Sequence, residues 1–116
     1  MAVKRIVRNV FAADPNAAIG FYRDILGMDV MMDHGFIVTL GTSVATTPQI
    51  SFASEGGSGT PVPDISIEVD DLEATLATMR AAGHPIEYGP VTEPWGVRRF
   101  YVRDPFGQLV NILSHD

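Results

Sequence analysis

The sequence contains no cysteine among its 116 residues. Disulfide bonds and thiolate metal sites are therefore excluded, and the composition fits a reducing compartment. Hydrophobic residues still make up 46% of the chain, which is enough to bury a core without covalent cross-links. The length is that of one domain, so we expect a single domain over residues 1–116.

Basic residues are few, with 8 Lys and Arg against 14 Asp and Glu and a formal net charge of -6. This balance disfavours a nucleic acid as partner. The one basic cluster is Arg98, Arg99 and Arg103. It is too small for a duplex but sufficient for one anionic or planar small molecule. The simpler interpretation is that Arg98 and Arg103 pair with nearby acids, such as Glu93, Asp104 or Asp116.

Long apolar runs are also missing. No stretch approaches the roughly 20 apolar residues of a membrane span, and the N-terminal residues lack the pattern of a secretory signal. We therefore expect a cytoplasmic protein that does not associate with membranes.

The first half of the chain predicts the order β-α-β-β-β. Branched residues predict a strand at Val3–Phe11, Asp14 is the expected N-cap, Pro15 the first helical residue, and Gly27 the end of the helix. Periodicity and turn residues then predict three strands, at residues 28–32, 36–40 and 49–53.

The second half predicts the same order. Residues 55–63 are rich in Gly, Ser and Pro and predict a flexible connection between module one (1–54) and module two (64–116). In module two we expect a strand at 64–69, a helix from Asp70 or Asp71 to Gly83, a short strand at 86–88, a loop at 90–96, and strands at 98–103 and 108–114. An offset of 57 residues, from Asp14 to Asp71, aligns the two halves.

This repeat predicts an α+β fold in which two pseudo-symmetric β-α-β-β-β modules form a curved mixed sheet with a central cleft. The turn Asp104-Pro105-Phe106-Gly107 fixes the last hairpin. The predicted register pairs Asp104 with Gln108, Val102 with Val110 and Phe100 with Ile112 on an apolar face, and Tyr101 with Asn111 and Arg99 with Leu113 on the other.

The chain resembles the vicinal oxygen chelate superfamily, which includes glyoxalases, extradiol dioxygenases and bleomycin-resistance proteins. The resemblance covers essentially the whole chain. It depends on the repeat and on short motifs in matching order: Asp14, Phe21-Tyr22 and Leu26-Gly27, then Val69-Asp70-Asp71-Leu72, then Asp104-Pro105 with Gly107.

Enzymes of this superfamily chelate a divalent metal with His or Glu on facing strands. Carried over residue by residue, the resemblance places those ligands at Val7, Asp64, Asn111 and either Ser51 or Phe52. Valine does not coordinate metals, and one carboxylate seldom holds zinc, nickel or iron. We therefore expect no metal and no other cofactor, and we expect His34, His84 and His115 to be surface residues.

The cleft instead predicts a surface for a flat molecule, with stacking rings, a guanidinium and an amide. The predicted ligand-binding residues are Asn9, Phe11, Phe52, Trp95, Arg99, Tyr101 and Asn111. The tract from Gly96 to Pro105 is similar to that of bleomycin-resistance proteins. We predict no catalytic residue, although Asp64 and Glu68 could form an acid–base pair.

The favoured hypothesis is a metal-independent protein that binds an aromatic or amphipathic small molecule. One alternative is a divalent-metal-dependent lyase, isomerase or dioxygenase of the same superfamily, and another is a module whose cleft only stabilises a partner. The resemblance and the uncovered sheet edges further lead us to expect a homodimer.

Overall fold

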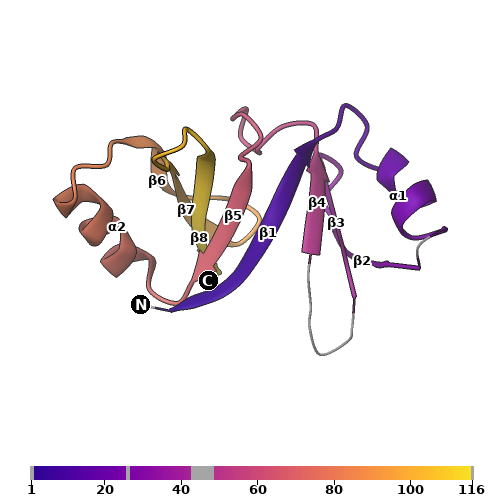
Figure 1. Cartoon of the computed structure of the whole chain (residues 1–116), viewed down its shortest axis with the longest axis horizontal. Coiled ribbons are helices and arrows are strands. Elements are labelled where there is room, and N and C mark those ends of the chain that lie inside the picture. Colours follow the sequence, from indigo (N-terminus) through magenta and orange to yellow (C-terminus); the bar gives the residue numbers. More distant parts are fainter. Residues whose placement is uncertain (1, 26, 43–48, 116) are drawn as a thin grey trace. The chain divides into compact units, whose positions relative to one another are not determined.

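The computed structural model describes residues 2–25, 27–42 and 49–115. Within these residues, eight strands form one mixed sheet in the order β2-β3-β4-β1-β5-β8-β7-β6, and two helices complete the fold (Figure 1). The elements are β1 (Val3–Phe11), α1 (Ala17–Tyr22), β2 (Asp29–Asp33), β3 (Ile37–Gly41), β4 (Gln49–Ala53), β5 (Ile65–Val69), α2 (Leu72–Ala81), β6 (Ile86–Thr92), β7 (Val97–Arg103) and β8 (Leu109–His115). The α+β class is confirmed. Neither described helix has the length and apolar character that a membrane crossing requires.

The chain forms two compact units, residues 7–62 and residues 63–116 together with residues 1–6. In each unit the first strand pairs parallel with the last, β1 with β4 and β5 with β8, and the other neighbours are antiparallel. The repeat seen in the sequence is thus a repeat of topology. Strand β1 contributes to both units, because its residues up to Ile6 belong with module two. The central cleft stays a prediction.

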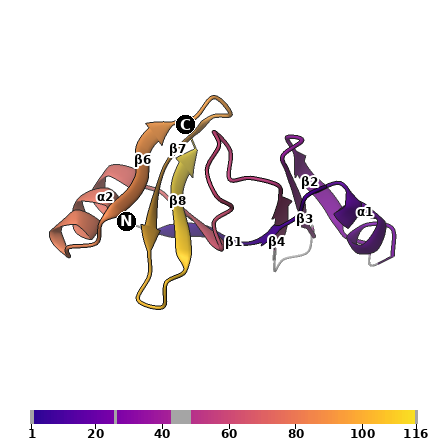
Figure 2. The ribbon, with the colours of Figure 1, turned by 90° about the horizontal axis from the view of Figure 1, so that it is seen from above.

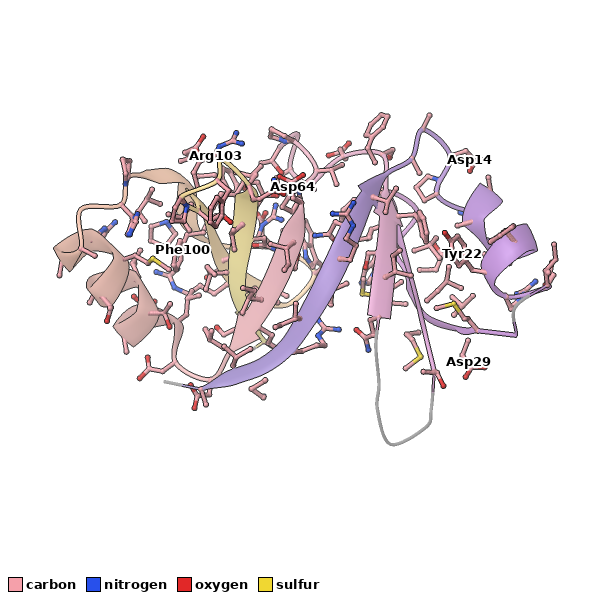
Figure 3. All side chains as sticks on the ribbon, viewed as in Figure 1. Asp14, Tyr22, Asp29, Asp64, Phe100 and Arg103 are labelled. Carbon is pink, nitrogen blue, oxygen red and sulfur yellow. The ribbon has the colours of Figure 1, made fainter. Side chains whose placement is uncertain are left out.

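In the unit of residues 63–116, α2 packs on one face of β8 and β7 (Figure 2). Asp71 is the N-cap, and its side chain accepts a hydrogen bond from Ala74 N at 3.0 Å. Gly83 follows the helix with a φ of 82°, as expected of a helix end. The core consists of Val69, Leu72, Leu76, Phe100, Val102, Val110 and Ile112. Figure 3 shows Phe100 between β7 and α2.

The predicted hairpin register is confirmed, with Phe100 opposite Ile112 and Tyr101 opposite Asn111. The side chain of Asp104 accepts hydrogen bonds from Phe106 N and Gln108 N, both at 2.9 Å. These bonds close the turn and hold the register. Since side chains alternate along a strand, Tyr101 and Asn111 lie on the sheet face away from α2.

In the unit of residues 7–62, α1 is shorter than predicted and begins at Ala17, with Asn16 as N-cap. Asp14 does not cap the helix through its carboxylate. Its carbonyl oxygen accepts from Ala17 N at 3.1 Å, in a tight turn that precedes the helix. The core of this unit contains Val38, Leu40 and Phe52, and α1 contributes Ile19 and Tyr22 to its edge.

Two connecting segments differ from expectation. Strand β6 extends to Thr92, whereas residues 90–96 were predicted to form a loop. The pairing of β6 with β7 is irregular between Tyr88 and Val91, so Pro90, which has no N–H, lies within the strand where regular pairing is interrupted.

Residues 55–63 include a hydrogen-bonded turn in which Gly56 N donates to Thr60 O at 2.8 Å. The remaining strand bounds lie within one residue of the prediction.

Candidate functional site

Polar side chains lie side by side on the face of the second unit that points away from α2. Ser66 on β5 is opposite Asn111 on β8, and Asn111 is opposite Tyr101 on β7. Leu109 and Leu113 flank Asn111 on the same face of β8. We call these five residues the Asn111 face. Four of them are at most 8% exposed, so they form a buried surface and not a solvated one.

The amide of Asn111 has one partner and lacks another. Its Nδ2 donates to Ser66 Oγ at 3.1 Å, whereas its Oδ1 is buried with no hydrogen-bond partner among the described residues. An unpaired buried acceptor costs about 1–3 kcal/mol, and native structures contain few of them. Asn111 Oδ1 can therefore accept a hydrogen bond from a molecule that binds at this face.

Arg99 does not present a free guanidinium, and its predicted role in ligand binding stays a prediction. It is 3% exposed, and its Nη2 and Nε lie 2.6 and 2.9 Å from Glu93 Oε2. Its Nη1 donates to Tyr101 Oη at 3.0 Å. The charge of Arg99 is thus neutralised inside the protein and is not available to an anionic ligand.

Three aromatic rings enclose this ion pair. The Cζ atom of Arg99 lies 5.3, 5.1 and 5.0 Å from the ring centroids of Tyr88, Trp95 and Tyr101. Tyr88 also donates its hydroxyl proton to Glu93 Oε2 at 3.1 Å. Cation–π contacts of this kind stabilise a desolvated guanidinium. Trp95, predicted to bind ligand, is half-buried and fixed against Arg99, so the connection between β6 and β7 is held in place.

The predicted site residues of the first unit separate onto two faces. Asn9 is 7% exposed and lies opposite Ser51, whose Oγ is 2.7 Å from Thr39 Oγ1. Phe52 does not share this face, because it alternates with Ser51 and packs on Tyr22 with ring centroids 4.9 Å apart. Phe52 therefore lies on the opposite face from Asn9, and its predicted role in ligand binding stays a prediction. Phe11 is 68% exposed.

Ser66 was not among the ligand-binding residues predicted from the sequence, although the internal repeat points to it. The offset of 57 residues places Ser66 at the position equivalent to Asn9. Both residues start a polar row that crosses to the last strand of their unit, Asn9 to Ser51 and Ser66 to Asn111. Tyr88 was missed as well, because its contact with Arg99 depends on the irregular pairing of β6.

The residues at the superfamily's metal positions do not fit a divalent metal. Val7 has no donor atom, and Asp64 Oδ2 accepts from Leu109 N at 2.8 Å. The amide of Asn111 and the hydroxyl of Ser51 are bonded to Ser66 and Thr39. Across residues 2–25, 27–42 and 49–115, no three His, Cys, Asp or Glu side chains gather closely enough to hold a metal ion.

His115 is exposed, as expected of a surface residue. It ends β8, and its Nδ1 lies 3.0 Å from Glu68 Oε2. His34 and His84 are exposed, as expected. Glu68 also lies 3.1 Å from Arg5 and 3.7 Å from Lys4. Within the described part of the chain, Asp64 and Glu68 therefore each have partners of their own and form no acid–base pair with one another.

Arg98 and Arg103 pair with acids on neighbouring elements, while Asp116, one of the partners predicted from the sequence, lies outside the described residues. Arg98 Nε lies 2.6 Å from Glu73 Oε1 on α2, and Arg103 Nε lies 2.7 Å from Glu87 Oε2 on β6. Both pairs are partly exposed, so each contributes little to stability. The acidic partners come from neighbouring elements, and Arg103 Nη1 also donates to Gly107 O in the adjoining turn at 3.0 Å.

The pKa of Glu68 gives a pH-dependent prediction. Burial acts to raise this pKa, but the hydrogen bond and charge of His115 and the charges of Arg5 and Lys4 outweigh it, so the pKa lies below its ordinary value. The unfolded pKa is about 4.3. The stabilisation is therefore present above that pH and is lost as the pH falls through the folded-state pKa.

We expect Glu68→Gln to lower the free energy of unfolding by about 1 kcal/mol at neutral pH, since Lys4 and His115 are exposed partners. The difference from the parent protein should shrink as the pH is lowered below about 4. Urea unfolding of both proteins across this range measures it. A difference that grows on acidification would contradict the assignment.

Two units of β-α-β-β-β topology, each with a parallel pair of its first and last strands, define the class of paired-module proteins. The chain belongs to the Glyoxalase/Bleomycin resistance protein/Dioxygenase superfamily, whose sequence model matches residues 3–112. The resemblance found in the sequence is thereby confirmed. Among curated proteins, no sequence matches the chain significantly.

Solved structures share the fold at low sequence identity. A Legionella pneumophila structure described as NAD-dependent benzaldehyde dehydrogenase has a TM-score of 0.75 at 12% identity, covering 97% of this chain and 100% of that one. Streptomyces coelicolor methylmalonyl-CoA epimerase in complex with 2-nitronate-propionyl-CoA has a TM-score of 0.71 at 20% identity, covering 98% and 96%. A superfamily member from Vibrio splendidus has a TM-score of 0.61 at 20% identity, covering 97% and 99%. These similarities concern the fold alone.

Proposed function

We propose that the protein is a metal-independent small-molecule-binding protein of the glyoxalase/bleomycin-resistance type, with the Asn111 face as part of its ligand site. The observation that carries the proposal is Asn111 itself. It occupies the position where the resemblance implies a metal-binding glutamate, and it offers one buried, unpaired oxygen in place of a carboxylate.

The other superfamily positions support the same function. Asp64 is engaged with the backbone of β8, Ser51 with Thr39, and Val7 has no donor. A divalent metal would have to break these bonds and would still gain few anionic ligands. A bound organic molecule needs none of them to change, because hydrogen bonding to Asn111 Oδ1 uses an acceptor that has no other partner.

Nearby aromatic groups favour an aromatic or amphipathic ligand. The rings of Tyr88 and Tyr101 lie 5.2 Å apart, and Trp95 is half-buried beside them. Tyr101 and the leucines of the Asn111 face supply apolar surface, so a ligand would gain affinity by burying its own apolar area.

Metal analysis and native mass spectrometry of protein purified without chelators test this function. We expect metal content well below one ion per chain and binding of an organic molecule from a screen that Asn111→Leu reduces by about tenfold or more, the loss of one well-formed hydrogen bond. Glu73→Gln, an exposed change on α2, is the matched control and should bind as the parent does. The same spectra report the homodimer that we predict.

One tightly held equivalent of zinc, nickel, iron or manganese, together with an activity on vicinal diketones, hemithioacetals or catechols that depends on it, would overturn the proposal. It would favour the metal-dependent lyase, isomerase or dioxygenase instead. Ligand binding unaffected by Asn111→Leu would place the site elsewhere in the chain.

A further inference from the structure

We propose that the Asn111 face selects ligands that donate a hydrogen bond and carry no negative charge, such as amides, amines and amidines, and discriminates against carboxylates and phosphates. This inference rests on the proposed function and assigns the ligand class to the same site. It follows from one unpaired acceptor, from its apolar surroundings, and from a cation that is already neutralised.

The missing hydrogen bond at Asn111 has a defined direction. An amide oxygen only accepts, and Asn111 Nδ2 is bonded to Ser66 Oγ at 3.1 Å. In the structure the amide nitrogen faces Ser66 Oγ and Oδ1 is the end without a partner among the described residues. The group that completes the site must therefore contribute an N–H or O–H donor to Asn111 Oδ1, and a carboxylate oxygen placed there would meet another acceptor.

The apolar surroundings of Asn111 strengthen this preference for a donor. Leu109 and Leu113 are each 5% exposed, and Tyr101 is 1% exposed. Such surroundings lower the local dielectric, which strengthens a well-formed hydrogen bond and raises the cost of an unpaired acceptor. A matched donor therefore gains more here than it would on a solvated surface, and a mismatched acceptor loses more.

The nearby positive charge is already neutralised. Arg99 is the basic residue that the sequence suggests as an anion-binding group, and its guanidinium is held 2.6 Å from Glu93 and enclosed by aromatic rings. Recruiting Arg99 for an anion would strip Glu93 of its counter-ion inside the protein. On β5, Glu68 follows Ser66 by two residues on the same face, and its carboxylate is paired with Arg5, so this pair offers no free cation to a negative ligand either.

Three planar molecules of nearly the same shape test the inference: benzamidine as its cation, benzamide, and benzoate. The first presents donors only, the second one donor group and one acceptor, and the third acceptors only. We expect titrations followed by the side-chain amide signal of Asn111 to show benzamidine and benzamide binding about tenfold or more tightly than benzoate, which corresponds to about 1.4 kcal/mol.

Two variants separate recognition from packing. Asn111→Leu removes the unpaired acceptor and puts an apolar side chain of similar size in its place, so it should fold with an unfolding midpoint no lower than the parent's and lose the preference for benzamidine over benzoate. Ser66→Ala removes the partner that orients the amide. The amide can then turn and present Nδ2, so the preference should narrow while binding persists.

Benzoate binding at Asn111 as tightly as benzamidine would overturn the inference and leave the proposed binding function standing. No shift of the Asn111 signal with any of the three probes would also overturn it. A stoichiometric metal in the purified protein would instead contradict the proposed metal-independent function. The titrations with the three probes do not measure metal content, so the two outcomes are distinguishable.

Discussion

Replacing Glu93 with glutamine should lower the free energy of unfolding by about 3 kcal/mol or more. Glu93 Oε2 accepts from two nitrogens of Arg99 and from the hydroxyl of Tyr88. Both side chains of the ion pair are at most 4% exposed. Glutamine keeps the shape but removes the charge, so the guanidinium would stay buried without a counter-ion, a change that costs about 3–5 kcal/mol in comparable pairs.

Glu73→Gln provides a matched control. Its bond to Arg98 has the same length as that between Glu93 and Arg99, 2.6 Å, but its side chain is 63% exposed. We expect a cost below about 1 kcal/mol for this variant. Chemical denaturation of both variants measures the contrast. Equal losses would show that burial does not set the strength of the Arg99–Glu93 pair.

A double variant, Glu93→Gln with Arg99→Met, separates the pair from the charge left behind. Methionine removes the guanidinium and retains an unbranched side chain among the rings of Tyr88, Trp95 and Tyr101. We expect the double variant to be more stable than Glu93→Gln alone, because no isolated charge remains in the interior.

The hairpin of β7 and β8 shows how far the sequence alone could lead. Turn residues at Asp104 to Gly107 fix the register, and alternation then assigns Phe100 to the core and Tyr101 to the other face. The same alternation places Arg99 correctly but says nothing of its partner. Glu93 reaches Arg99 because β6 continues to Thr92 and β7 begins only a few residues later. This extension of β6 depends on an irregular pairing with β7 that no local sequence pattern predicts.

The first unit shows where periodicity misleads. The apolar spacing predicted a first helix from Pro15 to Leu26, whereas the helix in the structure is Ala17–Tyr22. Gly20 within this segment lowers helix propensity, and none of the residues of α1 is fully buried, so packing supplies little to lengthen it. Phe52 lies on the opposite face from Asn9 for a related reason. Its neighbour Ser51 faces Asn9, and one residue along a strand reverses the face.

Gly89→Ala should lower the free energy of unfolding by about 3 kcal/mol, through the backbone that supports Arg99. Gly89 has a φ of 81°, and a Cβ atom there would lie 2.6 Å from Arg99 O and 3.2 Å from Phe100 Cα. Both neighbours are backbone atoms of β7, so no side chain can turn aside. The positive φ costs an alanine about 1–2 kcal/mol, and the overlap adds a similar amount.

Gly83→Ala separates these two contributions, since Gly83 has a φ of 82° but open space where its Cβ would lie. We expect it to cost about 1 kcal/mol, the conformational part alone. In Gly89→Ala the strand must also move away from β7, which would part the rings of Tyr88 and Tyr101 and loosen Trp95 against Arg99. The fluorescence of Trp95 should therefore change in Gly89→Ala and not in Gly83→Ala. Equal stability losses with unchanged fluorescence would show that β6 absorbs the extra atom without disturbing the buried ion pair.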